Sequence, residues 1–323
     1  MAEVKTLVVR KPCFGLPTGC PQCLSAYIYL NFAQIPFHLD FQLNNPHSDK
    51  IPYFEVGDCV VYNNEREGII DCLKKDAGVV DLDSEVSSLP EWISTKAILT
   101  TWLADALAYE LWVGCEASSA NSIYYSDLPW PLGKVLFWNK ARWVKLKHGI
   151  TNDNVEVKKE KIYEKANSAY DALSNCLGEQ NYLFENRPSS LDAIFLAHGL
   201  VVIQALPECS ILRIKFLEHG NLVRYVQRCK TELIEAAPSP SSGPQFHTDA
   251  SSSASKSHST WNSKPKNKTK REKTKEEKTF KRKAKYFVVA QLVAVVVFLT
   301  LMTTFDDTEV DVDDADGGYD YDE

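Results

Sequence analysis

The first residues of the chain lack the features of a cleaved targeting segment. No apolar stretch follows basic residues near the N-terminus, and this region is not rich in Arg and Ser. Secretory signal peptides have the first pattern, and organelle presequences have the second. An even, regularly spaced cysteine framework is also missing, because the nine Cys form an odd set. We therefore expect no cleaved leader, and a reducing, cytosolic environment for the body of the protein.

Metal ligands and excess positive charge are also scarce. Beyond Cys20-Pro21-Gln22-Cys23 there is no second C-x-x-C motif and no His pair at ligand spacing, so a zinc site would lack two of its four ligands. The first 263 residues carry 24 Lys or Arg against 30 Asp or Glu, which does not favour binding to a phosphate backbone. We expect no cofactor, no metal and no nucleic-acid partner.

Long apolar runs without charge are rare too, and residues 286–305 form the one of membrane-spanning length. Twenty residues at about 1.5 Å each would make a helix of roughly 30 Å, which matches the hydrocarbon core of a bilayer. Twelve of the twenty are Val, Leu or Phe, and eighteen residues follow them. The pattern predicts one C-terminal transmembrane helix that acts as a tail anchor.

The two flanks of this run carry opposite charge. Residues 264–285 hold twelve Lys or Arg and three Glu, whereas residues 306–323 hold ten acidic residues and no basic one. Basic flanks stay on the cytosolic side of a span, and they attract anionic lipid at about 1 kcal/mol per charge. We expect a lipid bilayer as a partner, with everything before Tyr286 on the cytosolic side and the acidic tail beyond the membrane.

Composition divides the remainder of the chain. Residues 238–285 are rich in Ser and Pro and then in Lys, with few aliphatic side chains, so we predict a disordered linker. The body before it is large enough for two small fused domains, and we place these at residues 1–80 and 81–237.

The sequence pattern of residues 1–80 predicts short strands and helices. We expect strands at residues 6–10, 37–42, 53–56 and 59–62, and helices at residues 21–33 and about 64–75. Gly57-Asp58 between the last two strands is typical of a hairpin turn. This order of elements is that of a thioredoxin-like domain.

Residues 81–237 show apolar repeats of 3.6 residues instead of strand alternation, which predicts an all-α domain. Trp102, Tyr109 and Trp112 recur at helical spacing, and we expect them in its core. Ser189 and Asp192 stand before the nearly all-apolar run 193–206 as an N-capping box, in which each side chain accepts the other residue's backbone N–H. Such a cap stabilises a helix by about 1 kcal/mol, and its role is structural.

A thioredoxin-like domain followed by a helical domain with Ser-x-x-Asp before its central helix is similar to the glutathione S-transferase fold. Local phrases are more specific and resemble the metaxin family, in particular its plant members. They are Phe14-Gly15-Leu16-Pro17, Leu177-Gly178-Glu179-Gln180, residues 188–193 and residues 221–225. With the tail anchor, the resemblance extends over nearly the whole chain except the linker.

The resemblance implies a non-enzymatic subunit of the sorting and assembly machinery in the mitochondrial outer membrane, which inserts β-barrel precursors. The implied partners are the β-barrel core subunit of that machinery, the outer-membrane import translocase and the β-barrel precursors. The acidic tail would lie in the intermembrane space. One feature departs from the pattern, since many outer-membrane tail anchors keep basic residues after the span and this chain has acids there.

An alternative hypothesis starts from Cys20 and Cys23. The sequence places this C-P-x-C at a helix N-terminus, where the helix dipole lowers a thiol pKa, as in glutaredoxins. Pro52 stands where thioredoxin-like folds have a cis-proline. These residues would make the chain a membrane-tethered, glutathione-dependent thiol transferase or oxidoreductase, with glutathione held by Pro52, Asn64 and Glu65.

Three features weaken the alternative. About nine residues with two prolines separate the first strand from Cys20, so we expect the dithiol to be displaced from the position of a redox loop. Asn63-Asn64-Glu65-Arg66 replaces the acidic residue followed by Ser that holds glutathione in transferases. No Tyr or Ser stands directly after the first strand as an activating hydroxyl.

Overall fold

The computed structural model describes residues 5–42, 48–57, 59–63, 68–76, 80–114, 118–184, 187–235, 286–287 and 291. Residues 1–244 form one compact unit, and the account below concerns that unit. Every buried apolar residue of the described core lies between Leu7 and Cys229, so this unit contains the complete described core and we expect it to fold by itself.

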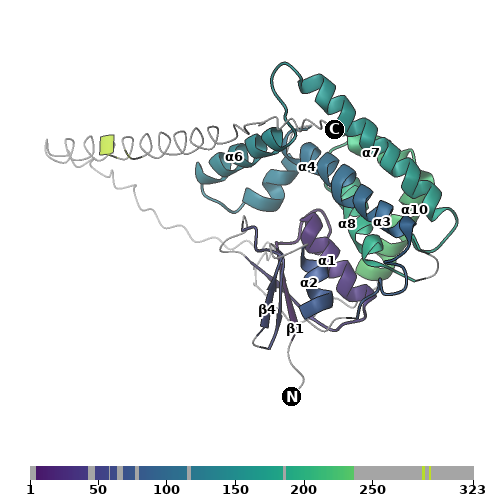
Figure 1. Ribbon diagram of the computed structural model, residues 1–323. Helices are drawn as coiled ribbons and strands as arrows, with labels where there is room; N and C mark the ends of the chain where they lie inside the picture. The colour runs from purple at the N-terminus through teal and green to yellow at the C-terminus, as the bar shows by residue number, and fades with distance from the viewer. Residues whose placement is uncertain are drawn as a thin grey trace, which may run out of the picture. The chain divides into compact units, whose positions relative to one another are not determined.

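The N-terminal part is α/β and the following part is all-helical, as the sequence predicts (Figure 1). The first part comprises β1 (Lys5–Val9), α1 (Pro21–Phe32), β2 (His38–Phe41), β3 (Tyr53–Val56), β4 (Cys59–Tyr62) and α2 (Ile69–Asp76). The second comprises α3 (Pro90–Ala97), η1 (Ile98–Leu103), α4 (Ala104–Trp112), α5 (Ser118–Ala120), η2 (Asn121–Tyr125), α6 (Leu132–Lys147), α7 (Val155–Leu177), α8 (Ser190–Gln204), α9 (Ile211–Leu217), α10 (Gly220–Lys230) and η3 (Thr231–Glu235). The η segments have wide π-type turns and mostly continue a neighbouring α-helix.

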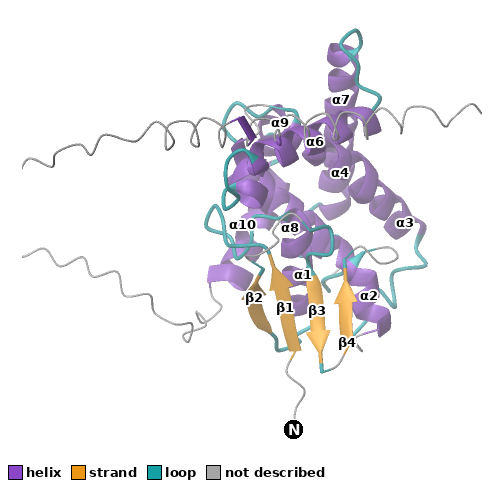
Figure 2. Cartoon of the chain, turned by 90° about the vertical axis from the view of Figure 1, so that its left-hand side faces the viewer, coloured by secondary structure: helices purple, strands orange, loops and turns teal. Residues whose placement is uncertain are grey.

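The four strands form one sheet in the order β2-β1-β3-β4, with β1 parallel to β2 and the other pairs antiparallel. Leu7, Phe54 and Val61 lie side by side across three strands and are all buried. Helices α1 and α2 lie behind the sheet in Figure 2, so one face of the sheet is packed on helices. Gly57 adopts φ +57° at the turn between β3 and β4, as the predicted hairpin requires.

Helix α8 is the central helix of the second part. Twelve of its fifteen residues are buried, and it packs against α1 and α10. A Cβ added at Gly199 would lie 2.7 Å from Cγ2 of Val226, so a glycine is needed where α8 and α10 approach. The separate contact between α8 and α1 joins the second part of the body to the first.

Two buried carboxylates hold the N-terminus of α8. Asp192 accepts hydrogen bonds from the Ser189 N–H at 2.9 Å, the Leu183 N–H at 2.9 Å and the Tyr225 hydroxyl at 2.6 Å, while Ser189 Oγ accepts the Asp192 N–H at 3.3 Å. Ser189 and Asp192 therefore form a capping box in the structure.

Asp83, which precedes α3, is the second carboxylate at this helix end. It is 1% exposed, and it accepts the Ser190 N–H at 2.8 Å as well as bonds from the Ser190 hydroxyl and the Lys74 ammonium. Since Lys74 belongs to α2, this carboxylate connects the first part of the body to the start of α8.

Two expectations about side chains need correction. Tyr109 and Trp112 are buried as expected, but Trp102 is 37% exposed, because it faces a hollow beside α7 and not the core. Cys209 is disulfide-bonded, which departs from the reducing environment that the cysteine pattern indicates. Cys13, Cys20, Cys23, Cys59, Cys176 and Cys229 form no disulfide.

Several predicted segments lie mostly or wholly outside the described residues. They are the linker at 238–285, the acidic tail at 306–323, and the span at 286–305 apart from Tyr286, Phe287 and Gln291. Among the helices that the structure describes, none has both the length and the apolar character needed to cross a bilayer.

We predict that Asp192→Ala lowers the free energy of unfolding by about 3 kcal/mol, because several buried donors lose their acceptor at once. Ser189→Ala should cost about 1 kcal/mol, as expected for an N-cap. Urea unfolding of the 1–244 unit measures both, with the exposed Asp153→Ala as control. Equal stability of the Asp192 variant and the control would contradict the anchoring role.

His198 generates a prediction about pH. Burial lowers its pKa to about 3, and its ring lies 2.7 Å from the Tyr170 hydroxyl. Below pH 6.5 the unfolded chain binds a proton that the folded chain does not, so stability is lost as pH falls from 6.5 toward 3, by up to about 1.4 kcal/mol per pH unit.

Urea unfolding between about pH 7 and pH 5 should therefore show a stability slope that His198→Gln reduces. The glutamine retains a polar group beside Tyr170 without a titrating ring. The exposed His38→Gln is the matched control and should keep the wild-type slope. An unchanged slope in the His198 variant would show that this ring is not the responsible group.

Candidate functional site

Cys20 and Cys23 lie at the start of α1, where the polypeptide comes close to β1 and to the second part of the body. Cys20 is the N-cap residue, and Pro21 is the first residue of the helix. The preceding loop turns at Phe14 and Gly15, both with positive φ. A Cβ at Gly19 would lie 2.9 Å from both the Cys13 and the Ile123 side chains, so the loop packs tightly there.

The long loop does not displace the dithiol from the helix end. Its turn at Phe14 and Gly15 folds the extra residues back, so that Cys20 still caps α1. The peptide bond between Ile51 and Pro52 is cis, and Arg10 donates a hydrogen bond to the Ile51 carbonyl at 3.1 Å. The structure therefore brings Cys20, Cys23 and the Pro52 turn together through one arginine.

Arg10 is the central group of this site. Its Nη1 lies 3.1 Å from Cys20 Sγ and 3.7 Å from Cys23 Sγ, and its Nη2 donates to the Ser48 carbonyl at 2.8 Å. Its guanidinium also lies over the ring of Tyr124, 4.8 Å from the ring centre. Arg10 is 3% exposed, so a cation is buried directly beside two thiols.

The thiols have different pKa values for identifiable reasons. Burial raises the pKa of Cys20, but the hydrogen bond with Cys23 and the charge of Arg10 outweigh it and hold the pKa well below the usual thiol value. Burial and the bond to Cys20 raise the pKa of Cys23 well above that value. The Tyr124 hydroxyl donates to Cys20 Sγ at 3.5 Å. The geometry favours a Cys20 thiolate paired with Arg10.

Access to this thiolate is closed. Both cysteines are 0% exposed, and Arg10 and Tyr124 separate them from a cavity of about 270 Å³ between the first part and helices α4 and α6. Neither sulfur lines that cavity. A nucleophile of this kind reacts only if Arg10 or Tyr124 moves.

The structure does not describe the other two residues of the alternative glutathione site. Asn64 and Glu65 lie outside the described residues, whereas Asn63 donates a side-chain hydrogen bond to Gln22 at 3.3 Å. Ser189 and Asp192 lie in the buried cap of α8 and are fully occupied by that structural role. Among described residues, no group of three or more potential metal ligands is present.

Sequence reasoning missed Arg10 and Tyr124. Arg10 had a detectable signal, a charge directly after an apolar strand, since such a residue needs a partner when buried. Tyr124 had none, because it stands 104 residues from Cys20 in the chain.

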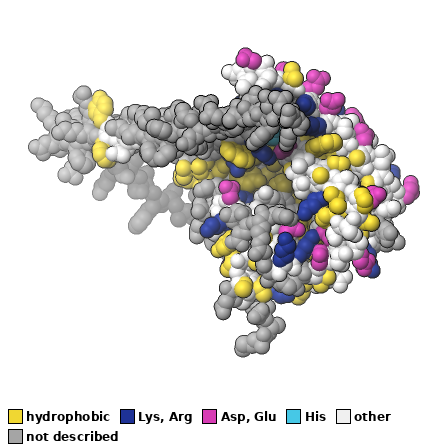
Figure 3. Space-filling view, viewed as in Figure 1, with side chains coloured by type: hydrophobic (Ala, Val, Ile, Leu, Met, Phe, Trp, Pro, Cys, Tyr) yellow, Lys and Arg dark blue, Asp and Glu magenta, His cyan; other side chains and the backbone are white. Residues whose placement is uncertain are grey.

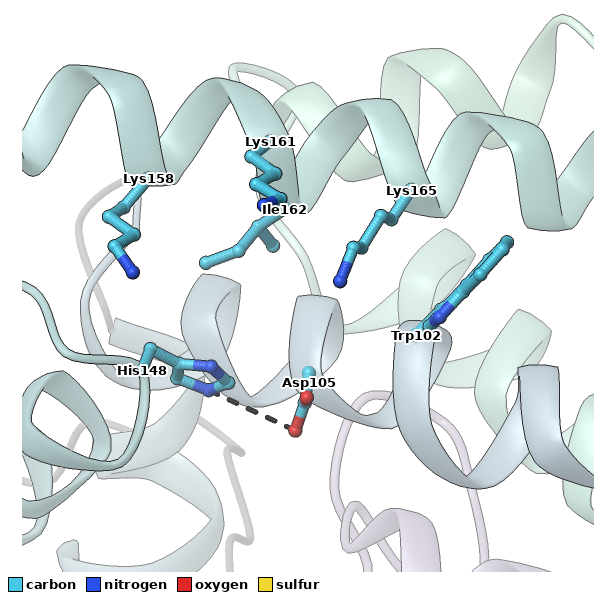
Figure 4. Close-up of a pocket in the computed structure, with 7 residues that line it drawn as sticks. All are labelled: Trp102, Asp105, His148, Lys158, Lys161, Ile162 and Lys165. Carbon is cyan, nitrogen blue, oxygen red and sulfur yellow. Dashed lines mark ion pairs between the residues drawn. The ribbon is translucent and has the colours of Figure 1, made fainter. Parts of the chain in front are cut away.

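A second cavity, of about 170 Å³, lies between α4 and α7. Figure 4 shows Lys158, Lys161 and Lys165 extending from α7 toward Asp105 and His148. Asp105 pairs with Lys147 at 2.9 Å and lies 3.9 Å from His148. Burial lowers the pKa of His148, Asp105 opposes this effect, and Lys147 and Lys158 add to it. The hollow is therefore a region of positive charge and does not pair a nucleophile with a base.

A thioredoxin-like domain joined to a helical domain through α1 and α8 defines the glutathione S-transferase class of fold. Two family models agree with this class. The glutathione S-transferase N-terminal domain matches residues 21–118, and the glutathione S-transferase C-terminal domain matches residues 166–229.

The chain belongs to the metaxin family. It is 52% identical over 314 residues to the "Mitochondrial outer membrane import complex protein METAXIN" of Arabidopsis thaliana, with 97% of this chain and 98% of that protein covered. It is 26% identical to Metaxin-2 of Mus musculus, with 66% of this chain and 81% of that protein covered. The solved glutathione transferase GSTFuA3 from Phanerochaete chrysosporium has a TM-score of 0.46 at 14% identity, with 71% and 96% of the two chains covered.

We predict that Cys20 and Cys23 react with iodoacetamide at least about tenfold more slowly than the exposed Cys59 in the native protein, because alkylation requires access as well as a thiolate. Tyr124→Ala should open the route to Cys20 and raise its rate selectively. Mass spectrometry of peptides from timed labelling distinguishes the sites. Fast labelling of Cys20 in the wild type would show that the site is open.

Proposed function

We propose that this chain is a non-enzymatic subunit of a mitochondrial outer membrane import complex. The observation that carries the proposal is the 52% identity to the Arabidopsis protein of that description, which extends over almost all of both chains. A similarity of this extent includes the body, the linker region and the C-terminal apolar run together.

The closed thiol site supports work by positioning and not by bond making. A transferase or oxidoreductase needs a thiol that reaches its substrate. Here Arg10 and Tyr124 occupy the approach to Cys20, and Arg10 is bound in turn to the backbone at Ser48 and Ile51. The buried contact between Arg10 and Cys20 connects the end of β1 to the start of α1.

The finer proposal concerns the membrane and the partners. Residues 286–305 would anchor the chain in the outer membrane with the body in the cytosol and the acidic tail in the intermembrane space. The body would then contact the β-barrel core subunit of the sorting and assembly machinery, the import translocase and incoming β-barrel precursors. The charge difference between residues 264–285 and 306–323 supports this orientation.

One binding mode for such partners is strand addition at the edge of the sheet. β4 is an edge strand, and its Val60 is 39% exposed. An extended segment of a precursor could pair with its backbone, as in other cases of strand addition. Groove binding between the two parts of the body is the second such mode.

The second candidate function is a membrane-tethered thiol transferase or oxidoreductase that uses glutathione. The specific observation in its favour is the geometry at Cys20, where Arg10 contacts both this thiol and the Ile51 carbonyl next to the cis Pro52. This activity would require Arg10 or Tyr124 to move in the presence of substrate, so that the substrate can reach the thiols.

Mitochondria that carry only the double variant Cys20→Ser, Cys23→Ser test the choice between the two functions. We expect assembly of newly imported porin to proceed at about the wild-type rate, because the thiols would contribute at most to packing. The measurement is native gel electrophoresis of radiolabelled porin over time, and mitochondria depleted of the protein provide the lower limit.

Loss of assembly in the double variant, with normal abundance of the protein, would overturn the non-enzymatic assignment. Glutathione-agarose binding by the 1–244 unit, abolished by Cys20→Ser, would favour the second candidate.

For location, the full chain should resist carbonate extraction from mitochondria. Release of the chain into the supernatant would contradict the proposed tail anchor.

A further inference from the structure

Helix α6 exposes apolar side chains on the face that points away from the core. Its buried side includes Gly133 and Val144. On the outward side, Leu132 is 46% exposed and Leu146 is 60% exposed. Trp143 is 54% exposed and also borders a hollow shared with Gln22 and Asn63 of the first part. Figure 3 shows apolar side chains gathered on the side of the molecule where α6 lies in Figure 1.

The outward residues form a stripe with a regular pattern. At about 100° per residue, Leu132, Val135, Trp143 and Leu146 fall close to one line along the helix, and Asn139 is the one polar residue on that line. Trp138 lies at the border of this line and is 58% exposed, and Trp130, just before the helix, is 79% exposed. Three of the seven tryptophans of the chain therefore lie in α6 or directly before it.

Cations border this stripe on both sides. By the same helical geometry, Lys134 and Lys145 lie along one border. Lys140 and Lys147 lie along the other, where they pair with Asp49 at 4.0 Å and Asp105 at 2.9 Å. Lys140 lies over the Trp143 ring at 4.8 Å, and Arg142 lies over the Trp138 ring at 5.9 Å. Residues 128–152 contain these five Lys or Arg and no Asp or Glu.

Few occupants match this combination of tryptophan, aliphatic side chains and lysine. Protein interfaces favour Trp and Arg but are depleted of Lys. A nucleic acid would use the cations but would leave the aliphatic stripe in water. The interface of an anionic membrane satisfies all three, because Trp prefers the headgroup level, aliphatic groups enter the acyl boundary and Lys reaches the lipid phosphates.

We propose that the outward face of α6 binds the surface of an anionic membrane, with Trp138, Trp143 and Leu146 in the interfacial layer and Lys134 and Lys145 at lipid phosphates. The inference does not rest on the span at 286–305. It supplies a second, peripheral contact that would fix which side of the body faces the bilayer and would leave other surfaces for protein partners.

The test uses the 1–244 unit, which contains every buried apolar residue that the structure describes, so that residues 286–305 do not contribute. Sucrose-loaded vesicles of phosphatidylcholine with about 30 mol% phosphatidylserine should pull down the unit, and pure phosphatidylcholine vesicles should bind it at least about tenfold less. Raising the salt concentration should weaken the binding, as expected for screened charges.

Two variants and their matched controls locate the contact. Lys134→Glu with Lys145→Glu should reduce binding at least about tenfold, whereas Lys161→Glu with Lys165→Glu, the same charge change on exposed residues of α7, should have a much smaller effect. Trp138→Ala with Trp143→Ala should also reduce binding about tenfold, and Trp102→Ala should not. Thermal melting of each variant establishes that the fold is intact.

Three results would overturn the proposal. Folded α6 variants that bind anionic vesicles like the wild type would place the contact elsewhere. Equal binding to neutral and anionic vesicles would remove the role of the lysines. A single-stranded oligonucleotide that binds the unit and displaces the vesicles without any effect of the tryptophan variants would make this face a general polyanion site.

Discussion

The body of this protein depends on how the N-terminus of α8 is held inside the core. A buried helix end leaves backbone N–H groups that water cannot reach, and each one left without an acceptor costs free energy. Asp192 and Asp83 supply acceptors from two directions. Because Asp83 also binds Lys74 of α2, the same constraint that places α8 connects the two parts of the body.

The thiol site is a consequence of this arrangement. Helix α1 packs on α8, and Arg10, which follows β1, and Tyr124 of η2 both contact Cys20 at the start of α1. Both thiols are excluded from solvent. Arg10 lies buried beside Cys20, and it also donates hydrogen bonds to the backbone carbonyls of Ile51 and Ser48 near Pro52. The fold thus contains two thiols, Cys20 and Cys23, that a substrate cannot reach. Such a site is compatible with a body that positions other proteins.

The surfaces of the body contrast with this closed interior. The stripe on α6 exposes tryptophans among cations, the edge of β4 exposes backbone, and the hollow between α4 and α7 concentrates lysines. They lie on different elements, so a membrane and a protein partner could be engaged at the same time. A scaffold needs several independent surfaces of this kind, whereas an enzyme needs one converging pocket.

Much of the fold was determined by local patterns in the sequence. The strands at 53–56 and 59–62, the start of α1 at Pro21 and the all-helical second part follow from alternation, turn residues and 3.6-residue periodicity, because these signals act within a few residues. The cap of α8 was equally local, since Ser189 and Asp192 are three residues apart.

Only the tertiary structure decided what these elements do together. Arg10 and Tyr124 meet Cys20 from far along the chain, and Trp102 follows the helical pattern of a core residue yet faces a hollow. The outward direction of the α6 stripe depended on which side of the helix is buried, and that side carries Gly133 and Val144. Periodicity predicts that a helix has two faces, but packing against distant segments determines which face is covered. That packing therefore also determines which residues stay exposed and can bind partners.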